Sequence, residues 1–154
     1  LVDRLVLTLN GSLLDGHYID YRNASGFDPQ TGIFSKGNDY TGNRTVRTPH
    51  FTGTAGISKS WNAPGGRIEV GGDVYRNSGF DYAASNDPRF SQLGYVLFGA
   101  RAGYRYQPWG LGVTLFGRNL GNKQVTQGLI ATDFGPNYSL APPITYGMRL
   151  NLEL

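Results

Sequence analysis

Residues 144–154 read ITYGMRLNLEL, and this stretch decides the fold because its side chains alternate strictly in polarity. Apolar residues occupy the even positions, and Thr, Gly, Arg, Asn and Glu occupy the odd ones. Successive side chains leave opposite faces of a β-strand. The period of two therefore predicts a strand with one apolar face and one polar face.

Five segments upstream have the same alternation. They lie at residues 4–13, 50–61, 67–75, 96–106 and 111–118. A tilted strand needs about 9–11 residues to cross the hydrocarbon of a membrane, and most of these segments are about that long. The sequence predicts an all-β chain that forms an antiparallel meander of about six long strands.

The connections between these segments alternate in length. Long polar loops are expected at about 20–49, 77–93 and 121–143, and tight turns at 62–66 and 107–110. Outer-membrane barrels put short turns at the periplasmic end and long loops at the extracellular end. We therefore expect the strands to be part of a transmembrane β-barrel. About eight strands is the smallest usual closed barrel, so six strands in isolation should form an open curved sheet.

Composition narrows the classes of function. The 154 residues include no cysteine, which excludes disulfides, thiolate metal sites and a cysteine nucleophile. Charged residues make up 16%, against roughly 25% in soluble domains. The net charge of +3 is scattered, so no nucleic-acid partner is expected. No run of apolar residues is long enough for a transmembrane helix.

Charged side chains fall on the predicted polar faces. Each would lose several kcal/mol of hydration in a dry core. A wet lumen, or a polar domain that fills it, accepts them, and the apolar face then meets lipid. Lys59 interrupts the apolar face and is expected near a membrane boundary. The residues expected to face a lumen or plug are Arg67, Glu69, Asp73, Arg101, Arg105, Arg118 and Arg149.

Aromatic side chains cluster at the two predicted short turns. They are expected to form a girdle at the periplasmic membrane interface, and the alternative is that they are ordinary residues flanking turns. The four residues are Trp61, Tyr104, Tyr106 and Trp109.

The long loops carry aromatic and cationic residues. These suit an anionic, catecholate-bearing ligand through ion pairs and cation–π contacts. The alternative is that such residues interlock the loops with one another. The ligand-binding candidates are Tyr21, Arg22, Phe34, Tyr40, Arg44, Tyr82, Arg89 and Phe134.

Three stretches resemble TonB-dependent outer-membrane receptors. Residues 116–123 read FGRNLGNK, residues 93–105 read LGYVLFGARAGYR after Asn86-Asp87-Pro88, and residues 143–154 form the terminal strand. Their order and spacing carry the resemblance, whereas the first 80 residues agree with the family in layout more than in amino-acid identity. The sequence departs from the family at Leu154, where an aromatic residue is usual, and at Val125, where a tyrosine often stands.

The resemblance implies a function and partners. Such receptors have a barrel of about 22 strands closed by an N-terminal plug. They import ferric siderophores, haem, cobalamin or glycans with energy passed through TonB. Residues 1–154 would then form the C-terminal portion of such a barrel, without the plug domain and the TonB box. The expected location is the bacterial outer membrane.

The partners that follow are outer-membrane lipid, the receptor's own plug domain, the TonB complex through an upstream segment, and a small ligand such as a ferric siderophore. No cofactor, metal or enzymatic activity is expected. Three alternatives stay open: a passive porin, a soluble secreted β-sheet adhesin or binding module, and an outer-membrane hydrolase dependent on His50.

Overall fold

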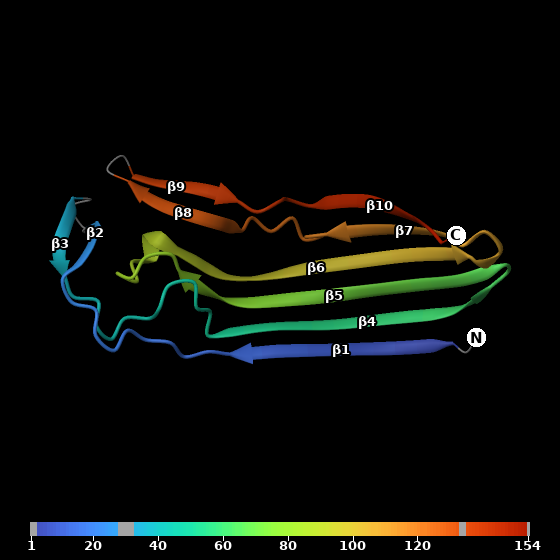
Figure 1. Ribbon diagram of the computed structural model, residues 1–154, viewed down its shortest axis with the longest axis horizontal. Helices are drawn as coiled ribbons and strands as arrows, with labels where there is room; N and C mark the ends of the chain where they lie inside the picture. The colour runs from blue at the N-terminus through green and yellow to red at the C-terminus, as the bar shows by residue number, and fades with distance from the viewer. Residues whose placement is uncertain (1–2, 28–32, 133–134, 154) are drawn as a thin grey trace.

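The computed structural model describes residues 3–27, 33–132 and 135–153. Six long strands lie side by side in one antiparallel sheet with the order β1-β4-β5-β6-β7-β10 (Figure 1). The predicted all-β meander is confirmed. The strands are β1 (Arg4–Leu13), β4 (Phe51–Ala63), β5 (Gly66–Asp81), β6 (Ser91–Tyr106), β7 (Leu111–Arg118) and β10 (Thr145–Leu152).

Two short connections join these strands at one end of the sheet. β4 and β5 are linked by Pro64 and Gly65, and β6 and β7 by the 3-10 turn η2 (Gln107–Trp109) and Gly110. Gly65 has φ 71° and Gly110 has φ 59°, which are left-handed conformations that glycine adopts without steric cost. The tight turns predicted at 62–66 and 107–110 are therefore confirmed.

The other end of the sheet carries the three long connections (Figure 1). The first contains the hairpin of β2 (Ala24–Phe27) and β3 (Phe34–Asn38), and the third contains that of β8 (Thr126–Thr132) and β9 (Gly135–Leu140). The second contains the short turn η1 (Pro88–Phe90). Neither hairpin was predicted from the sequence. No helix of the described residues is both long and apolar enough to cross a membrane.

Strand lengths differ from the prediction. β5 and β6 have 16 residues each, because pairing continues through Asn77 with Tyr95 and Gly79 with Leu93. The loop predicted at 77–93 therefore shrinks to residues 82–90. β7 keeps the predicted bounds of 111–118, and β10 has eight residues.

The strand register joins the apolar faces into one continuous surface. The same alignment puts the polar residues on the opposite face, as the period of two requires. One apolar row crosses all six strands through Leu5, Lys59, Val70, Ala102, Leu115 and Met148.

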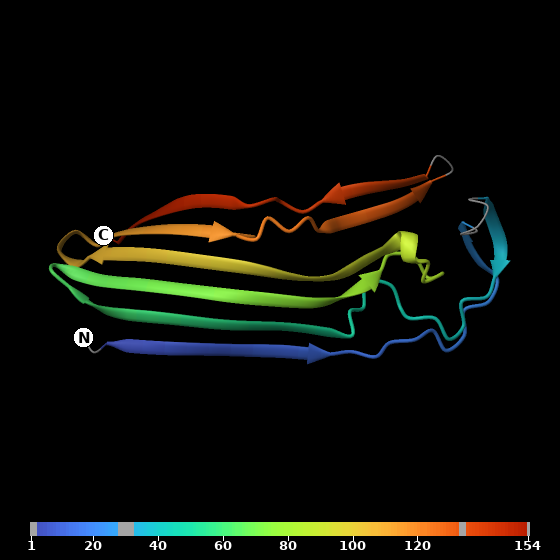
Figure 2. The same ribbon diagram turned by 180° about the vertical axis from the view of Figure 1, so that it is seen from behind.

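The described residues form no second layer over the six-stranded sheet. Among the described residues only Ala24 and Val125 are buried hydrophobic side chains, and both lie outside the six long strands. On the apolar face, Leu9 is 84% exposed and Leu150 is 62% exposed. No other element crosses the middle of the sheet in the two opposite views (Figures 1 and 2).

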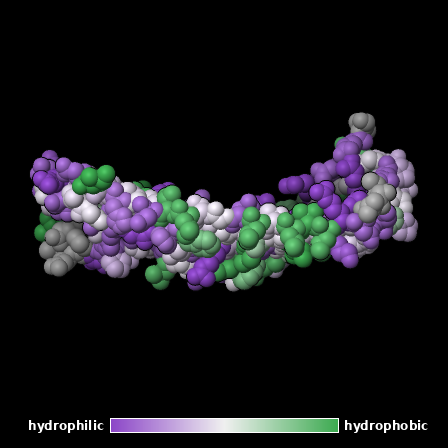
Figure 3. All heavy atoms as spheres, turned by 90° about the horizontal axis from the view of Figure 1, so that it is seen from below, coloured by the Kyte–Doolittle hydropathy of each residue, from purple (hydrophilic) through white to green (hydrophobic). Residues whose placement is uncertain are grey.

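Hydrophobic residues gather over the middle of the long axis, and hydrophilic residues dominate both ends (Figure 3). This distribution differs from that of a two-layer sandwich, in which the apolar residues would be enclosed.

Candidate functional site

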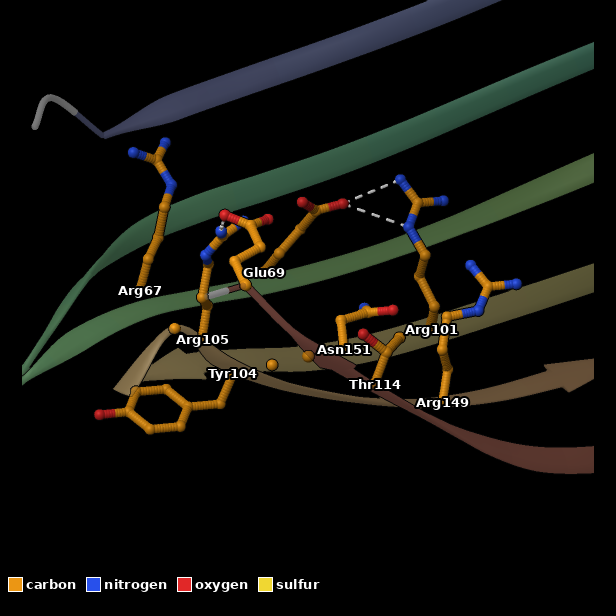
Figure 4. Close-up of a pocket in the computed structure, with 12 residues that line it drawn as sticks. Arg67, Glu69, Arg101, Tyr104, Arg105, Thr114, Arg149 and Asn151 are labelled. Atoms are coloured by element: carbon orange, nitrogen blue, oxygen red, sulfur yellow. Dashed lines mark hydrogen bonds and ion pairs between the residues drawn. The ribbon is translucent and has the colours of Figure 1, made fainter. Parts of the chain in front are cut away.

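The strongest candidate site is a hollow of about 430 Å³ on the polar face, near the short turns. β5 contributes Arg67 and Glu69, and β6 contributes Arg101 and Arg105. Arg149 and Asn151 of β10 complete its far side. The charged side chains rise from the same face, whereas Tyr104 points away from them (Figure 4).

The register explains why these residues meet. Glu69 pairs with Gly103, Gly103 with Thr114, and Thr114 with Arg149, so they form one row across four strands. A Cβ at Gly103 would lie 2.9 Å from the Thr114 Oγ1 atom. Glycine at this position therefore leaves room for the hollow between the long charged side chains.

Two ion pairs span the hollow. The Arg101 guanidinium donates from Nε and Nη2 to Glu69 Oε1 at 3.2 and 3.0 Å (Figure 4). Arg105 pairs with Glu153, just beyond the end of β10. These side chains are about half exposed, so solvent screening limits each pair to about 0–1 kcal/mol.

The hollow has an excess of positive charge. Four arginines line it against two glutamates. The Arg67 Nη2 atom donates to the Ser60 hydroxyl at 2.5 Å. Arg149 has no hydrogen bond or ion pair with any described residue. The surface is therefore suited to carboxylate or phosphate groups, which arginine binds through paired N–H donors.

A second hollow of about 370 Å³ continues the polar face toward the loops. Asp73 and Arg118 line it, and Arg101 and Arg149 border both hollows. The Arg118 guanidinium lies 5.3 Å from the ring centre of Phe116. All seven residues predicted to face a lumen or plug thus lie on one face of the sheet, which is the side opposite the apolar surface.

The four predicted girdle aromatics gather at the short turns. Tyr106 and Trp109 pack edge to face with ring centres 5.4 Å apart. The Tyr104 hydroxyl donates to the carbonyl of Pro64 at 2.5 Å. Trp61 shares an apolar-face row with Tyr104 through Ile68. The group is therefore a band at one end of the apolar face, and Trp109 is 70% exposed.

The first long connection carries five of the predicted ligand residues. Tyr21 and Tyr40 pack together at 5.7 Å, and Arg22 lies 3.5 Å from Asp20. Phe34 is a half-exposed residue of β3. Arg44 lies in the loop, and its Nη2 atom is buried without a hydrogen-bond partner.

The predicted ligand residues of the second connection contact other loops. The Tyr82 hydroxyl donates to the carbonyl of Thr126 at 2.5 Å, and Arg47 lies 5.6 Å over the Tyr82 ring. Burial raises the pKa of the Tyr82 hydroxyl, and the charge of Arg47 opposes this rise. Arg89 pairs with Asp87, and the Tyr138 hydroxyl donates to the Arg89 carbonyl at 3.4 Å. Phe134 lies outside the described residues.

Asparagines that the sequence did not single out also tie the loops together. Asn86 Oδ1 accepts from the Arg44 backbone N–H at 2.7 Å, and Asn86 Nδ2 donates to the Arg44 carbonyl at 3.0 Å. The Asn43 amide donates to the Ala84 carbonyl at 2.8 Å. These contacts join residues some forty positions apart, and no local sequence pattern predicts such pairs.

The described residues contain no group of three His, Cys, Asp or Glu side chains that could hold a metal ion. No protein-family model, curated protein or solved structure matches this chain. The geometry of the two faces of the sheet is therefore the basis for proposing a function.

Proposed function

We propose that this sheet is part of the wall of an outer-membrane β-barrel of the TonB-dependent receptor type, and that its function is the uptake of a scarce nutrient such as a ferric siderophore. One observation carries the proposal: an exposed apolar face continuous over six strands lies back to back with a face rich in arginine. Lipid would cover the first face, and a wet lumen or polar plug would meet the second.

The charges favour a plugged lumen over an empty one. Arg149 and its neighbours leave the polar face with more positive than negative charge. Carboxylates of a plug domain would neutralise it, and so would an anionic ligand on its way through the barrel. The sheet also leaves β1 and β10 with one partner each among the described residues, so further strands are needed to close a barrel.

Cysteine scanning tests the membrane assignment directly, because the chain has no cysteine of its own. Single cysteines replace Ala55 and Ile57 on the apolar face of β4, and Thr54 and Ser58 on its polar face. A membrane-impermeant maleimide should label Cys at 54 and 58 in intact membranes. Cys at 55 and 57 should react only after detergent is added.

Equal labelling of all four positions without detergent would contradict the membrane wall. A soluble adhesin or binding module predicts this result, together with recovery of the protein in the aqueous fraction. An apolar face that is labelled in water cannot be facing hydrocarbon.

Energy dependence separates active uptake from a passive porin. Uptake of a ferric siderophore by cells that depend on this protein should stop when a protonophore collapses the proton gradient. Diffusion through a porin would continue. A membrane-embedded protein whose transport is insensitive to the protonophore would refute the TonB-dependent part of the proposal and leave the barrel intact.

A further inference from the structure

A separate hollow of about 530 Å³ lies at the loop end of the sheet. Its lining includes two cations, Arg76 of β5 and Lys123 of the segment after β7, together with the apolar side chains of Val96 and Phe98. Of these four residues, Phe98 alone also lines one of the arginine-lined hollows of the polar face.

The register places the cation of β5 on the apolar side of the sheet. Arg76 pairs with Gly53 on one side and with Val96 on the other, in the same set of alternate positions as Val70 and Val74. The turn that carries Lys123 is held against β6 by the Leu120 N–H, which donates to the Phe98 carbonyl at 3.0 Å.

Two glycines, Gly94 and Gly121, lie in the lining of this hollow. A Cβ at Gly121 would meet only Phe98, at 3.7 Å. A Cβ at Gly94, by contrast, would lie 3.1 Å from the Ser78 carbonyl oxygen, so glycine there allows the close approach of β5. The lining of the hollow therefore combines glycine backbone, the ring of Phe98 and the two cations.

The two cations have no side-chain partners within the described part of the chain. Arg76 and Lys123 are both exposed, and neither side chain makes a hydrogen bond or ion pair with a described residue. A cation on a lipid-facing surface is costly at the centre of a membrane and is tolerated where it reaches the headgroups.

The position of Arg76 along the strand fits the headgroup level. Lys59, the other cation of the apolar face, pairs with Val70, six residues before Arg76. At about 3.4 Å per residue, about 20 Å of strand separates the two levels. The long side chains of Lys59 and Arg76 can reach outward from these levels toward the headgroups. The distance between their charges then approaches the height of the apolar band of outer-membrane barrels, which is roughly 25 Å.

We propose that Arg76 and Lys123 bind the phosphate of a phosphorylated lipid headgroup, with the first part of the acyl chains lying on Val96 and Phe98. The inference rests on the proposed membrane location. Arginine supplies paired N–H donors to phosphate oxygens, and lysine adds a compact charge. The binding would fix the depth of the wall at its loop end.

Vesicle partitioning of the full chain tests the inference. One set of vesicles contains phosphatidylcholine alone, and the other contains phosphatidylcholine with one third phosphatidylglycerol. Phosphatidylglycerol is the probe because its phosphate gives the headgroup a net negative charge. A single basic residue at an anionic surface is worth about 1 kcal/mol, or about fivefold in affinity. Arg76→Gln and Lys123→Gln should each reduce the preference for the anionic vesicles by about that factor.

Matched variants control for loss of charge alone. Lys36→Gln removes a cation from an exposed position of β3, away from the hollow, and should change the preference much less. Arg76→Lys should retain part of it. Added inorganic phosphate should not compete, because the site needs the acyl chains as well as the phosphate.

The outcomes separate the two proposals. Wild-type chain that binds neither vesicle refutes the membrane location and this inference with it. Wild-type chain that binds both vesicles, with Arg76→Gln and Lys123→Gln no weaker than Lys36→Gln, refutes the lipid site alone. Competition by inorganic phosphate would also refute it, because the site would then hold a free anion.

Discussion

At the scale of single residues, Asn119 shows what one side chain of the stretch FGRNLGNK (residues 116–123) contributes to the turn after β7. Its φ of 49° is left-handed, and its side chain makes three hydrogen bonds. Asn119 Oδ1 accepts from the Lys123 N–H at 2.8 Å, and Nδ2 donates to the carbonyls of Lys123 at 2.9 Å and Pro142 at 3.3 Å. One residue therefore shapes the turn after β7 and ties it to the approach to β10.

Substitutions at Asn119 should separate the two contributions. Asn119→Gly keeps the left-handed backbone and loses the side-chain bonds, at a cost of about 1–2 kcal/mol. Asn119→Ala also incurs the left-handed penalty of about 1 kcal/mol for a residue with a Cβ. Denaturant unfolding of the protein in detergent measures both. Equal stability of the Gly and Ala variants would show that the backbone conformation contributes nothing.

Asp87 is a second residue whose role is local. Its carboxylate caps η1 by accepting from the Arg89 N–H at 2.8 Å, and it pairs with the Arg89 guanidinium. These hydrogen bonds hold the pKa of Asp87 below its usual value of 3.8. A lowered pKa means that the stabilisation is complete above about pH 3.8 and is lost as the pH falls through the lower folded pKa.

Replacement of Asp87 should loosen the loop between β5 and β6. Asp87→Ala should destabilise it by about 1 kcal/mol, mainly through loss of the cap, because the exposed Arg89 side chain is screened by solvent. Faster tryptic cleavage after Arg89 at neutral pH measures the effect, with Ser85→Ala as the control in the same loop. An unchanged cleavage rate in Asp87→Ala would contradict the cap.

At the scale of strands, the sequence predicted which side chains share a face of the sheet, but it did not predict the residues at which the strands end. A period of two fixes which side chains share a face, and register then carried the seven polar-face residues to one side of the sheet. It does not fix where pairing stops. β5 runs on through Asn77 and Gly79, which read as loop residues in the sequence. The β2–β3 hairpin is only four and five residues long and shifts register at Ala24, so no period emerges.

The partners of the polar-face arginines were also beyond the sequence. Glu69 was one of several carboxylates available to Arg101, and only the lateral offset of β5 and β6 selects it. In the same way, contacts such as Asn86 with Arg44 depend on how three long connections fold over one end of the sheet. These choices are set by tertiary geometry and leave no local pattern.

Adjacent positions on one strand should respond oppositely to the same substitution. Val113 lies on the apolar face of β7, and its neighbour Thr114 faces Arg149 across the polar hollow. Val113→Glu should impair membrane assembly by about 1 kcal/mol, because a carboxylate would face the edge of the hydrocarbon beside the row of Trp61 and Tyr104. Thr114→Glu should be tolerated, since it can pair with Arg149. Heat-modifiable migration in gels measures assembly. An equal loss of assembly in both variants would contradict a sheet with lipid on one face and water or a plug on the other.

At the scale of the whole molecule, the sheet buries few apolar side chains among its described residues. Hydrophobic burial is the main favourable term in folding, and it must exceed the loss of conformational entropy. Here Leu7, Leu9 and Leu152 on the edge strands are at least 60% exposed, and Ile57, Val70 and Leu115 on the central strands are 53%, 45% and 57% exposed. The backbone pairing of six strands provides order, but the free energy that stabilises it has to come from a medium that covers the apolar surface.

Detergent should therefore control folding. In aqueous buffer the chain should show little cooperative β-structure by circular dichroism, and strand content should appear when detergent exceeds its critical micelle concentration. Trp109, which is 70% exposed at the short-turn end, should shift its fluorescence to shorter wavelength at the same detergent concentration. A cooperative thermal unfolding transition in buffer without detergent would mean that another protein surface covers the apolar face, and the soluble binding module would then replace the barrel wall.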